Sequence, residues 1–180
     1  MKLEITERGE NSFYDEFLYI LSNYKKILIN PKMKVSKLTL YALKLTIISL
    51  VFLILFTIFY ILDSSFKFFI VVIGLFTFLV ILGTIYYFLI RSNIKKLKNK
   101  EGTIVIKFND DEIEYNSDNN FKLKWNDINN IIINKYSISF IPKSKDNILM
   151  SIDKKYLNDV LKAINKYKKE ELLVDNSQLY

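Results

Sequence analysis

The chain has 180 residues, a formal net charge of +7, and neither cysteine nor histidine. The missing cysteine excludes disulfides, thiol nucleophiles and thiolate metal sites. The missing histidine removes the commonest general base and the usual imidazole ligand of zinc. The four glycines are isolated, so there is no glycine-rich phosphate loop. We therefore expect no catalytic residue, no cofactor and no metal, and a protein that is not an enzyme.

The positive charge is unevenly distributed along the chain. Residues 91–100 carry five basic and no acidic side chains, whereas residues 101–180 carry 12 basic and 13 acidic ones. A nucleic-acid-binding domain needs a basic face of its own, and this nearly neutral segment offers none. We therefore expect no nucleic-acid partner, and we expect anionic lipid headgroups as partners of the basic segments.

Residues 1–37 are predicted to form an N-terminal cytoplasmic segment with a short strand over residues 2–6 and an amphipathic helix of about four turns. The apolar side chains of that helix recur at helical spacing, namely Phe13, Phe17, Ile20, Leu21, Tyr24 and Leu28. Pro31 should end it. Its polar face is mixed rather than strongly basic, which favours packing on protein over lying on a bilayer, although both remain open.

Two apolar runs follow, over residues 45–62 and residues 68–90. They contain 18 and 23 residues, against roughly 20 needed to cross a bilayer core as a helix. A helix of a soluble protein that has one face in water would show a polar stripe, and neither run has one. Only residues 63–67 separate the runs, so we predict a transmembrane helical hairpin over residues 38–92.

Basic residues flank the hairpin on the side of both chain ends. The candidate contacts to lipid headgroups are Lys32, Lys34, Lys37, Arg91, Lys95, Lys96 and Lys98. Because the connection at 63–67 has only Lys67, the positive-inside rule predicts a multi-pass protein of the cell membrane with both termini in the cytoplasm. A basic linker is expected over residues 93–102. No acidic residue or arginine interrupts the spans, which argues against a transporter; homo-oligomerisation remains open.

Residues 103–170 are predicted to form a small folded domain, followed by a tail over residues 171–180. About six strands are expected, over residues 103–108, 112–115, 121–125, 130–134, 137–141 and 148–152. A helix should begin after Asp153, with an apolar stripe from Tyr156 to Tyr167. The predicted fold class is therefore α+β: a transmembrane hairpin plus a small antiparallel sheet or barrel capped by a C-terminal helix.

Few side chains in this domain suggest a binding site. Trp125 ends an alternating strand and is interpreted mainly as a core anchor, with Asp127 capping the turn that follows. Four lysines could gather at one rim, namely Lys122, Lys124, Lys143 and Lys145. The acidic cluster of Asp110, Asp111, Glu112 and Glu114 lacks the spacing of a calcium-binding loop and is interpreted as a solvated turn.

Three short segments of this domain stand out as motifs, namely Phe108-Asn109-Asp110-Asp111-Glu112-Ile113, Trp125-Asn126-Asp127-Ile128 and Phe140-Ile141-Pro142-Lys143. They resemble segments of the YcxB-like family of bacterial membrane proteins. The chain departs from the family pattern in lacking a glycine in the first turn and in having polar residues 144–147 after the basic residue. The resemblance implies two transmembrane helices and a pleckstrin-homology-like (PH-like) C-terminal domain, and it implies no catalytic residue.

Two hypotheses about function follow. The first is a non-enzymatic, membrane-anchored adaptor whose PH-like domain binds a protein partner or the lipid surface at the inner face of the membrane. The alternative is immunity, in which a small two-span protein protects its own membrane against a bacteriocin or another membrane-targeting toxin. Phosphoinositide binding is not inferred from a fold alone.

Overall fold

The computed structural model describes residues 1–5, 9–63, 68–99, 103–117 and 120–179. The chain forms two compact units. One, here called the hairpin unit, is Ser36–Lys96; the other, the sheet unit, combines Met1–Val35 with Leu97–Tyr180. The sheet unit is therefore built from both ends of the chain, and the hairpin unit is inserted between them in sequence.

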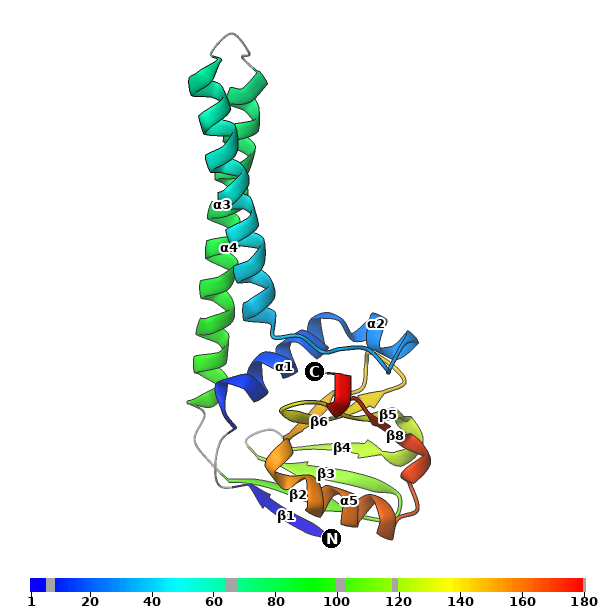
Figure 1. The fold of residues 1–180 in the computed structure, drawn as a ribbon. Helices are drawn as coiled ribbons and strands as arrows, with labels where there is room; N and C mark the ends of the chain where they lie inside the picture. Colours follow the sequence, from blue (N-terminus) through cyan, green and yellow to red (C-terminus); the bar gives the residue numbers. More distant parts are fainter. Residues whose placement is uncertain (6–8, 64–67, 100–102, 118–119, 180) are drawn as a thin grey trace. The chain divides into compact units, whose positions relative to one another are not determined.

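The hairpin unit consists of α3 (Leu38–Leu62) and all but the last two residues of α4 (Phe68–Lys98), and the two helices lie side by side (Figure 1). Leu97 and Lys98 at the end of α4 belong to the sheet unit. Both are long and apolar enough to cross a membrane, and only 6 % of the most apolar stretch of each is buried. A core helix of a soluble protein would be mostly buried, so this exposure is compatible with a membrane protein. Helix α4 continues to Lys98, so most of the expected linker over residues 93–102 is helical. The reason is that residues 91–98 contain no glycine or proline.

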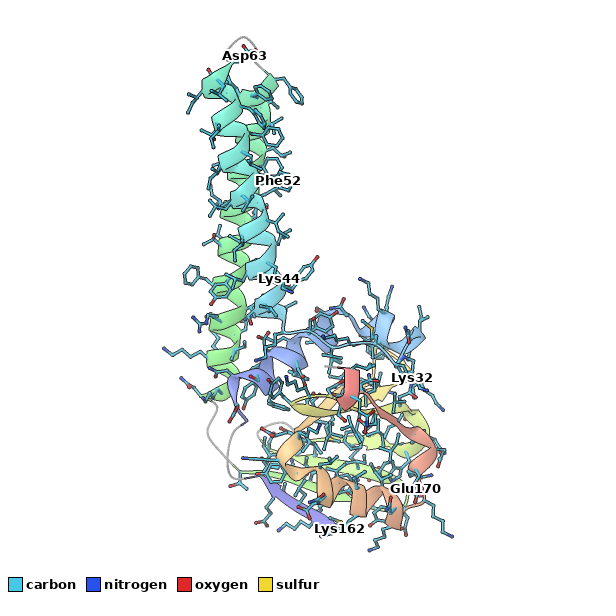
Figure 2. All side chains as sticks on the ribbon, in the orientation of Figure 1. Lys32, Lys44, Phe52, Asp63, Lys162 and Glu170 are labelled. Carbon is cyan, nitrogen blue, oxygen red and sulfur yellow. The ribbon has the colours of Figure 1, made fainter. Side chains whose placement is uncertain are left out.

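Aromatic rings from both helices interleave along the hairpin. Phe52 and Phe56 of α3 stack on Phe76 of α4 with ring centroids 5.3 and 5.6 Å apart. Figure 2 labels Phe52 on this part of α3. Nearer the N-terminal end of α3, Gly83 of α4 faces Thr46 of α3. A Cβ added to Gly83 would overlap Thr46 Oγ1. The helices are thus packed by stacked rings in one part and by a small residue in another.

The first sheet of the sheet unit is antiparallel, in the order β1-β2-β3-β4. Its strands are β1 (Lys2–Ile5), β2 (Ile104–Phe108), β3 (Glu112–Asn116) and β4 (Phe121–Lys124). Strand β1 pairs with β2, with Leu3 opposite Ile106, although the whole hairpin separates them in sequence. The strands alternate between buried and solvent-facing side chains, which is typical of a sheet with one wet face.

The second sheet has the order β7-β6-β5-β8. It comprises β5 (Ile128–Ile133), β6 (Ser137–Pro142), β7 (Met150–Asp153) and β8 (Leu173–Asp175). Strand β8 lies in the predicted tail and pairs parallel with β5. The prediction of a purely antiparallel sheet is therefore wrong for this strand. All six residues of β6 are buried, because both faces of this sheet are covered.

One face of the second sheet meets the first sheet and α5 (Leu157–Lys166) around a shared apolar core. That core contains Phe108, Trp125, Phe140 and Val160. The helix predicted after Asp153 is confirmed: Asp153 Oδ1 accepts from the Lys155 main-chain N–H at 3.0 Å, a 3-10 turn follows, and α5 begins at Leu157.

The other face of the second sheet is covered by α1 (Asn11–Ser22) and α2 (Tyr24–Ile29). Ile20, Tyr24 and Ile27 form a second apolar cluster with Ile132 and Ile141. The preference for packing on protein is therefore confirmed for the inner face of this segment. The single predicted helix is divided at Asn23, whose side chain amide donates to the Tyr19 carbonyl at 3.0 Å.

Candidate binding pocket

The sheet unit contains a cavity of about 350 Å³ at one end of the space between its two sheets. Side chains from four places line it: the inner face of the first sheet, α1, the last turn of α4, and β7 with the two residues before it. The other end of this space is filled by Phe108, Trp125 and Phe140, and the Trp125 and Phe140 rings each lie with their centroids 6.4 Å from that of Phe108. The cavity is therefore the unfilled end of the main core.

The floor of the cavity is a cross-strand row on the first sheet. Ile106 lies opposite Tyr115, and Tyr115 lies opposite Phe121. The Tyr115 and Phe121 rings stack with centroids 4.5 Å apart. Ile104 and Ile5 form the next row, because they also face each other in the register. This floor is apolar and aromatic, which is typical of pockets that bind an apolar group.

Helix α1 forms the opposite wall through Phe13, Tyr14 and Phe17. Phe13 and Phe17 are four residues apart and so lie on one face of the helix. Gly9 precedes the helix, and a Cβ added there would come within 2.6 Å of Phe13 Cδ1 and 3.0 Å of Asp153 Oδ2. Glycine is thus the residue that lets the chain pass between Phe13 and the end of β7.

The remaining wall comes from β7 and the residues before it, where Ile148 is 52 % exposed at the edge of the cavity. Three polar residues line the pocket: Ser117, Ser151 and Asp153. The Ser151 hydroxyl is paired with Ser139 Oγ at 2.8 Å. Asp153 is used to cap the 3-10 turn before α5. The pocket therefore offers apolar contact with a few polar groups, and its single carboxylate has a structural role.

Trp125 lies where the sequence placed it, in the core at the end of β4. Its side chain is 3 % exposed, and its indole N–H donates to the Asn109 carbonyl at 2.8 Å. Asp127 was expected to cap the turn after the strand, but it is the last residue of the 3-10 turn Trp125–Asp127. Its contact is through the main chain, where its carbonyl accepts from the Lys143 N–H at 2.7 Å.

The four candidate lysines fall into two groups. Lys122 and Lys124 lie on the outer face of the first sheet, opposite Glu114 and Glu112. Lys122 Nζ contacts both carboxylates, and hydrogen bonding to Glu112 and then to Glu114 raises the pKa of Lys122 above its usual value. The charge of Lys122 is thus balanced by two carboxylates of the neighbouring strand, as suits a cross-strand charge pair.

Lys143 and Lys145 follow β6 and are exposed. Tyr24 of α2 donates its hydroxyl to the Pro142 carbonyl at 2.5 Å, which places the start of this loop beside α2. Burial, and next the charge of Asp146, raises the pKa of Tyr24. The start of this loop therefore lies beside α2, while its Lys143 N–H also bonds to Asp127, three residues after Lys124. Whether the four lysines form one rim stays a prediction.

The candidate lipid-contacting residues are mostly exposed. Of Lys32, Lys34, Lys37, Arg91, Lys95, Lys96 and Lys98, only Lys37 is half-buried. Arg91, Lys95 and Lys98 recur at four- and three-residue steps, which places them on one stripe of α4. The Arg91 guanidinium lies 5.5 Å from the centre of the Tyr87 ring, an arrangement suited to a cation at an aromatic belt.

The acidic cluster is divided between two environments. Asp110 and Asp111 are exposed in the turn between β2 and β3, while Glu112 and Glu114 lie on β3 and contact Lys122. Within the described residues, no group of three or more acidic side chains is arranged to hold a metal ion. Two of these acidic residues therefore belong to an exposed turn, and the other two form ion pairs with a lysine of the neighbouring strand.

Sequence reasoning did not find the pocket. Its walls come from residues more than 100 positions apart, and no local period indicates an incompletely filled core. One signal was present: Ile148 is an apolar residue directly after the polar stretch 143–147. Comparison of the chain with protein-family models, with curated proteins and with solved structures gives no match.

Proposed function

We propose that this protein is a membrane-anchored, non-enzymatic binding module whose pocket takes an apolar side chain of a partner protein at the inner face of the bacterial membrane. The observation that carries the proposal is the 350 Å³ cavity between α1, the first sheet and β7. Its aromatic floor suits an apolar anchor, and the sequence provides neither histidine nor cysteine for chemistry there.

The position of β7 suggests how a partner would approach. Among the described strands, β7 pairs only with β6 and so is an edge of its sheet. Lys154 N donates to the Tyr136 carbonyl, which continues the β6–β7 ladder. In the alternation of an antiparallel pair, Ser151 and Asp153 then direct their main-chain groups away from β6. An extended segment of a partner could add to this edge and place one side chain in the pocket.

The proposal also includes the anchor and the fold. α3 and α4 would cross the membrane. The lysines before α3 and the arginine and lysines at the end of α4 would keep both termini in the cytoplasm. Four strands in one sheet, then β5 to β7 in the other and then α5, support a PH-like domain of the kind found in the YcxB-like family. The first strand of this proposed domain, β1, is contributed by the N-terminal segment that precedes α3 in sequence.

The test is site-specific photocrosslinking of the full-length protein in its native membranes. A photoreactive residue at Ile148 should yield one defined adduct, and mass spectrometry should find an extended apolar segment of the partner at the crosslink. The same residue at Leu179, which is 45 % exposed and does not line the pocket, is the position control. No adduct at 148, or the same adduct at 179, would refute the proposal.

A pocket-filling variant separates binding from proximity. Ile104→Trp adds a ring to the cavity wall, whereas Val105→Trp places the same ring on the opposite face of β2. We expect the adduct at 148 to disappear in the first variant and to persist in the second, with both variants folded by circular dichroism. The alternative function, protection against a membrane-targeting toxin, places activity in the hairpin and predicts that Ile104→Trp leaves protection unchanged.

A further inference from the structure

The segment formed by α1 and α2 has two different faces. Its inner face is fully used, because Ile20, Tyr24 and Ile27 are buried against the second sheet. Its outer face carries Leu21, Lys25 and Ile29 at four-residue steps across the break at Asn23. Leu21 is 53 % exposed and Ile29 is 85 % exposed. Two large apolar side chains therefore project from a segment that has already buried its core-facing residues.

The charges around these two side chains are mostly positive. Lys25, Lys26, Lys32 and Lys34 are all exposed, and Figure 2 labels Lys32 on the chain after α2. Residues 17–62 contain no aspartate or glutamate. The neighbouring loop after β6 adds Lys143 and Lys145 together with one acid, Asp146. The surface therefore combines an apolar wedge with a surplus of positive charge.

This combination fits the interface of an anionic bilayer better than a protein surface. A bilayer interface accepts apolar side chains below its headgroups and attracts lysines at the headgroup level. The segment is also held close to such a surface by the chain itself. If α3 crosses the bilayer as proposed above, Ile29 is tied to it: eight residues separate Ile29 from Leu38, the first residue of α3, and the nine steps between these two positions span at most about 30 Å.

We propose that the outer face of α1 and α2, defined by Leu21, Lys25, Lys26, Ile29 and Lys32, docks on the anionic leaflet of the bilayer. Leu21 and Ile29 enter the boundary between headgroups and acyl chains, and the lysines contact the headgroups. This contact is separate from the pocket, whose rim residue Ile148 is not part of it. It restrains the sheet unit through a second attachment in addition to the hairpin.

The test uses the absence of native cysteine. Ile29→Cys in the full chain is labelled with an environment-sensitive fluorophore and reconstituted into vesicles of phosphatidylcholine alone or of equal parts phosphatidylcholine and phosphatidylglycerol. We expect a blue-shifted emission, and quenching by lipids brominated on their acyl chains, in the anionic vesicles. Lys162 of α5, labelled in Figure 2, has a side chain that is 73 % exposed. The same fluorophore at Lys162→Cys should show neither effect.

A second variant tests the role of charge. Replacing Lys25 and Lys26 by serine in the Ile29→Cys background should remove the blue shift in anionic vesicles. The proposal is overturned if the labels at 29 and 162 behave alike in anionic vesicles, or if the double lysine replacement changes nothing. It is also overturned if the label at 29 becomes buried only when a membrane protein fraction is added, since the face would then belong to a protein partner.

Discussion

Glu16 of α1 and Ser137 of β6 are 121 residues apart in sequence, and their side chains form a buried hydrogen bond of 2.8 Å. The same carboxylate oxygen accepts the main-chain N–H of Tyr136 at 3.1 Å. This carboxylate therefore joins the segment before the hairpin to the sheet after it. It also positions α1, which supplies one wall of the pocket.

Removal of this carboxylate should loosen α1. Glu16→Ala leaves the Tyr136 amide and the Ser137 hydroxyl without their acceptor, and we expect it to lower the free energy of unfolding by about 1–3 kcal/mol. Hydrogen exchange should accelerate at the Tyr136 amide. Glu10→Ala, at an exposed position just before α1, is the matched control. Equal effects of the two substitutions would show that the contact does not hold the helix.

The tail fixes the chain that leads into the hairpin. Asn176 is buried, and its side chain amide donates to the carbonyls of Pro31 and Met33 at 2.7 and 3.1 Å. Asn176→Ala should lower the free energy of unfolding by about 1–2 kcal/mol and increase proteolysis near residue 31. Gln178→Ala changes an exposed amide two residues away and should have no effect. Unchanged proteolysis in Asn176→Ala would contradict the assignment.

The strands from β2 to β7 could be predicted because local signals define them. Alternation in β4, and the turns at 109–111 and 143–147, mark where strands end. The helix α5 could be predicted in the same way, because its apolar stripe is also a local signal. Local order of this kind is visible in a short window of sequence.

Long-range pairing could not be predicted in the same way. The tail strand β8 has three residues, too few to show a period, and its pairing with β5 depends on contacts made elsewhere. The partner of β1 lies beyond the hairpin, so no local feature identifies it. The pocket follows from both kinds of contact, because it forms where α1 and β7 fail to fill the space above Tyr115 and Phe121.

Stability of the sheet unit should decline at alkaline pH through Tyr24. Burial raises the pKa of its phenol above 10.0, so the folded state keeps the proton longer than the unfolded state. The contribution of Tyr24 is therefore complete below about pH 10 and is lost as the pH rises through the folded-state pKa. The hydrogen bond to Pro142 is lost with the proton.

Tyr24→Phe isolates this effect. The variant should be less stable than the parent by about 1 kcal/mol at neutral pH, because the Pro142 carbonyl loses its donor. The difference between the two proteins should then shrink as the pH rises above about 10, as measured by chemical denaturation at each pH. A difference that stays constant over this range would show that the phenol does not titrate with unfolding.

The two glycines of α4 provide a matched test of hairpin packing. A Cβ on Gly83 would overlap Thr46 Oγ1, whereas a Cβ on Gly74 would meet nothing within 4 Å. Gly83→Ala must therefore separate α3 from α4 or move Thr46, whose hydroxyl is bonded to the Ala42 carbonyl at 3.0 Å. Overpacking of this kind typically costs about 1–3 kcal/mol. Gly74→Ala should be neutral or slightly stabilising, since alanine favours helix more than glycine does.

Denaturation in mixed micelles, followed by far-ultraviolet circular dichroism, measures this difference in the full chain. Gly83→Ala should unfold at a lower fraction of denaturing detergent than Gly74→Ala. Thr46→Ala in the Gly83→Ala background removes the hydroxyl that the new methyl group meets, so it should restore part of the loss. If both glycine substitutions shift the midpoint equally, the close approach of α3 and α4 at Gly83 does not contribute to the stability of the hairpin.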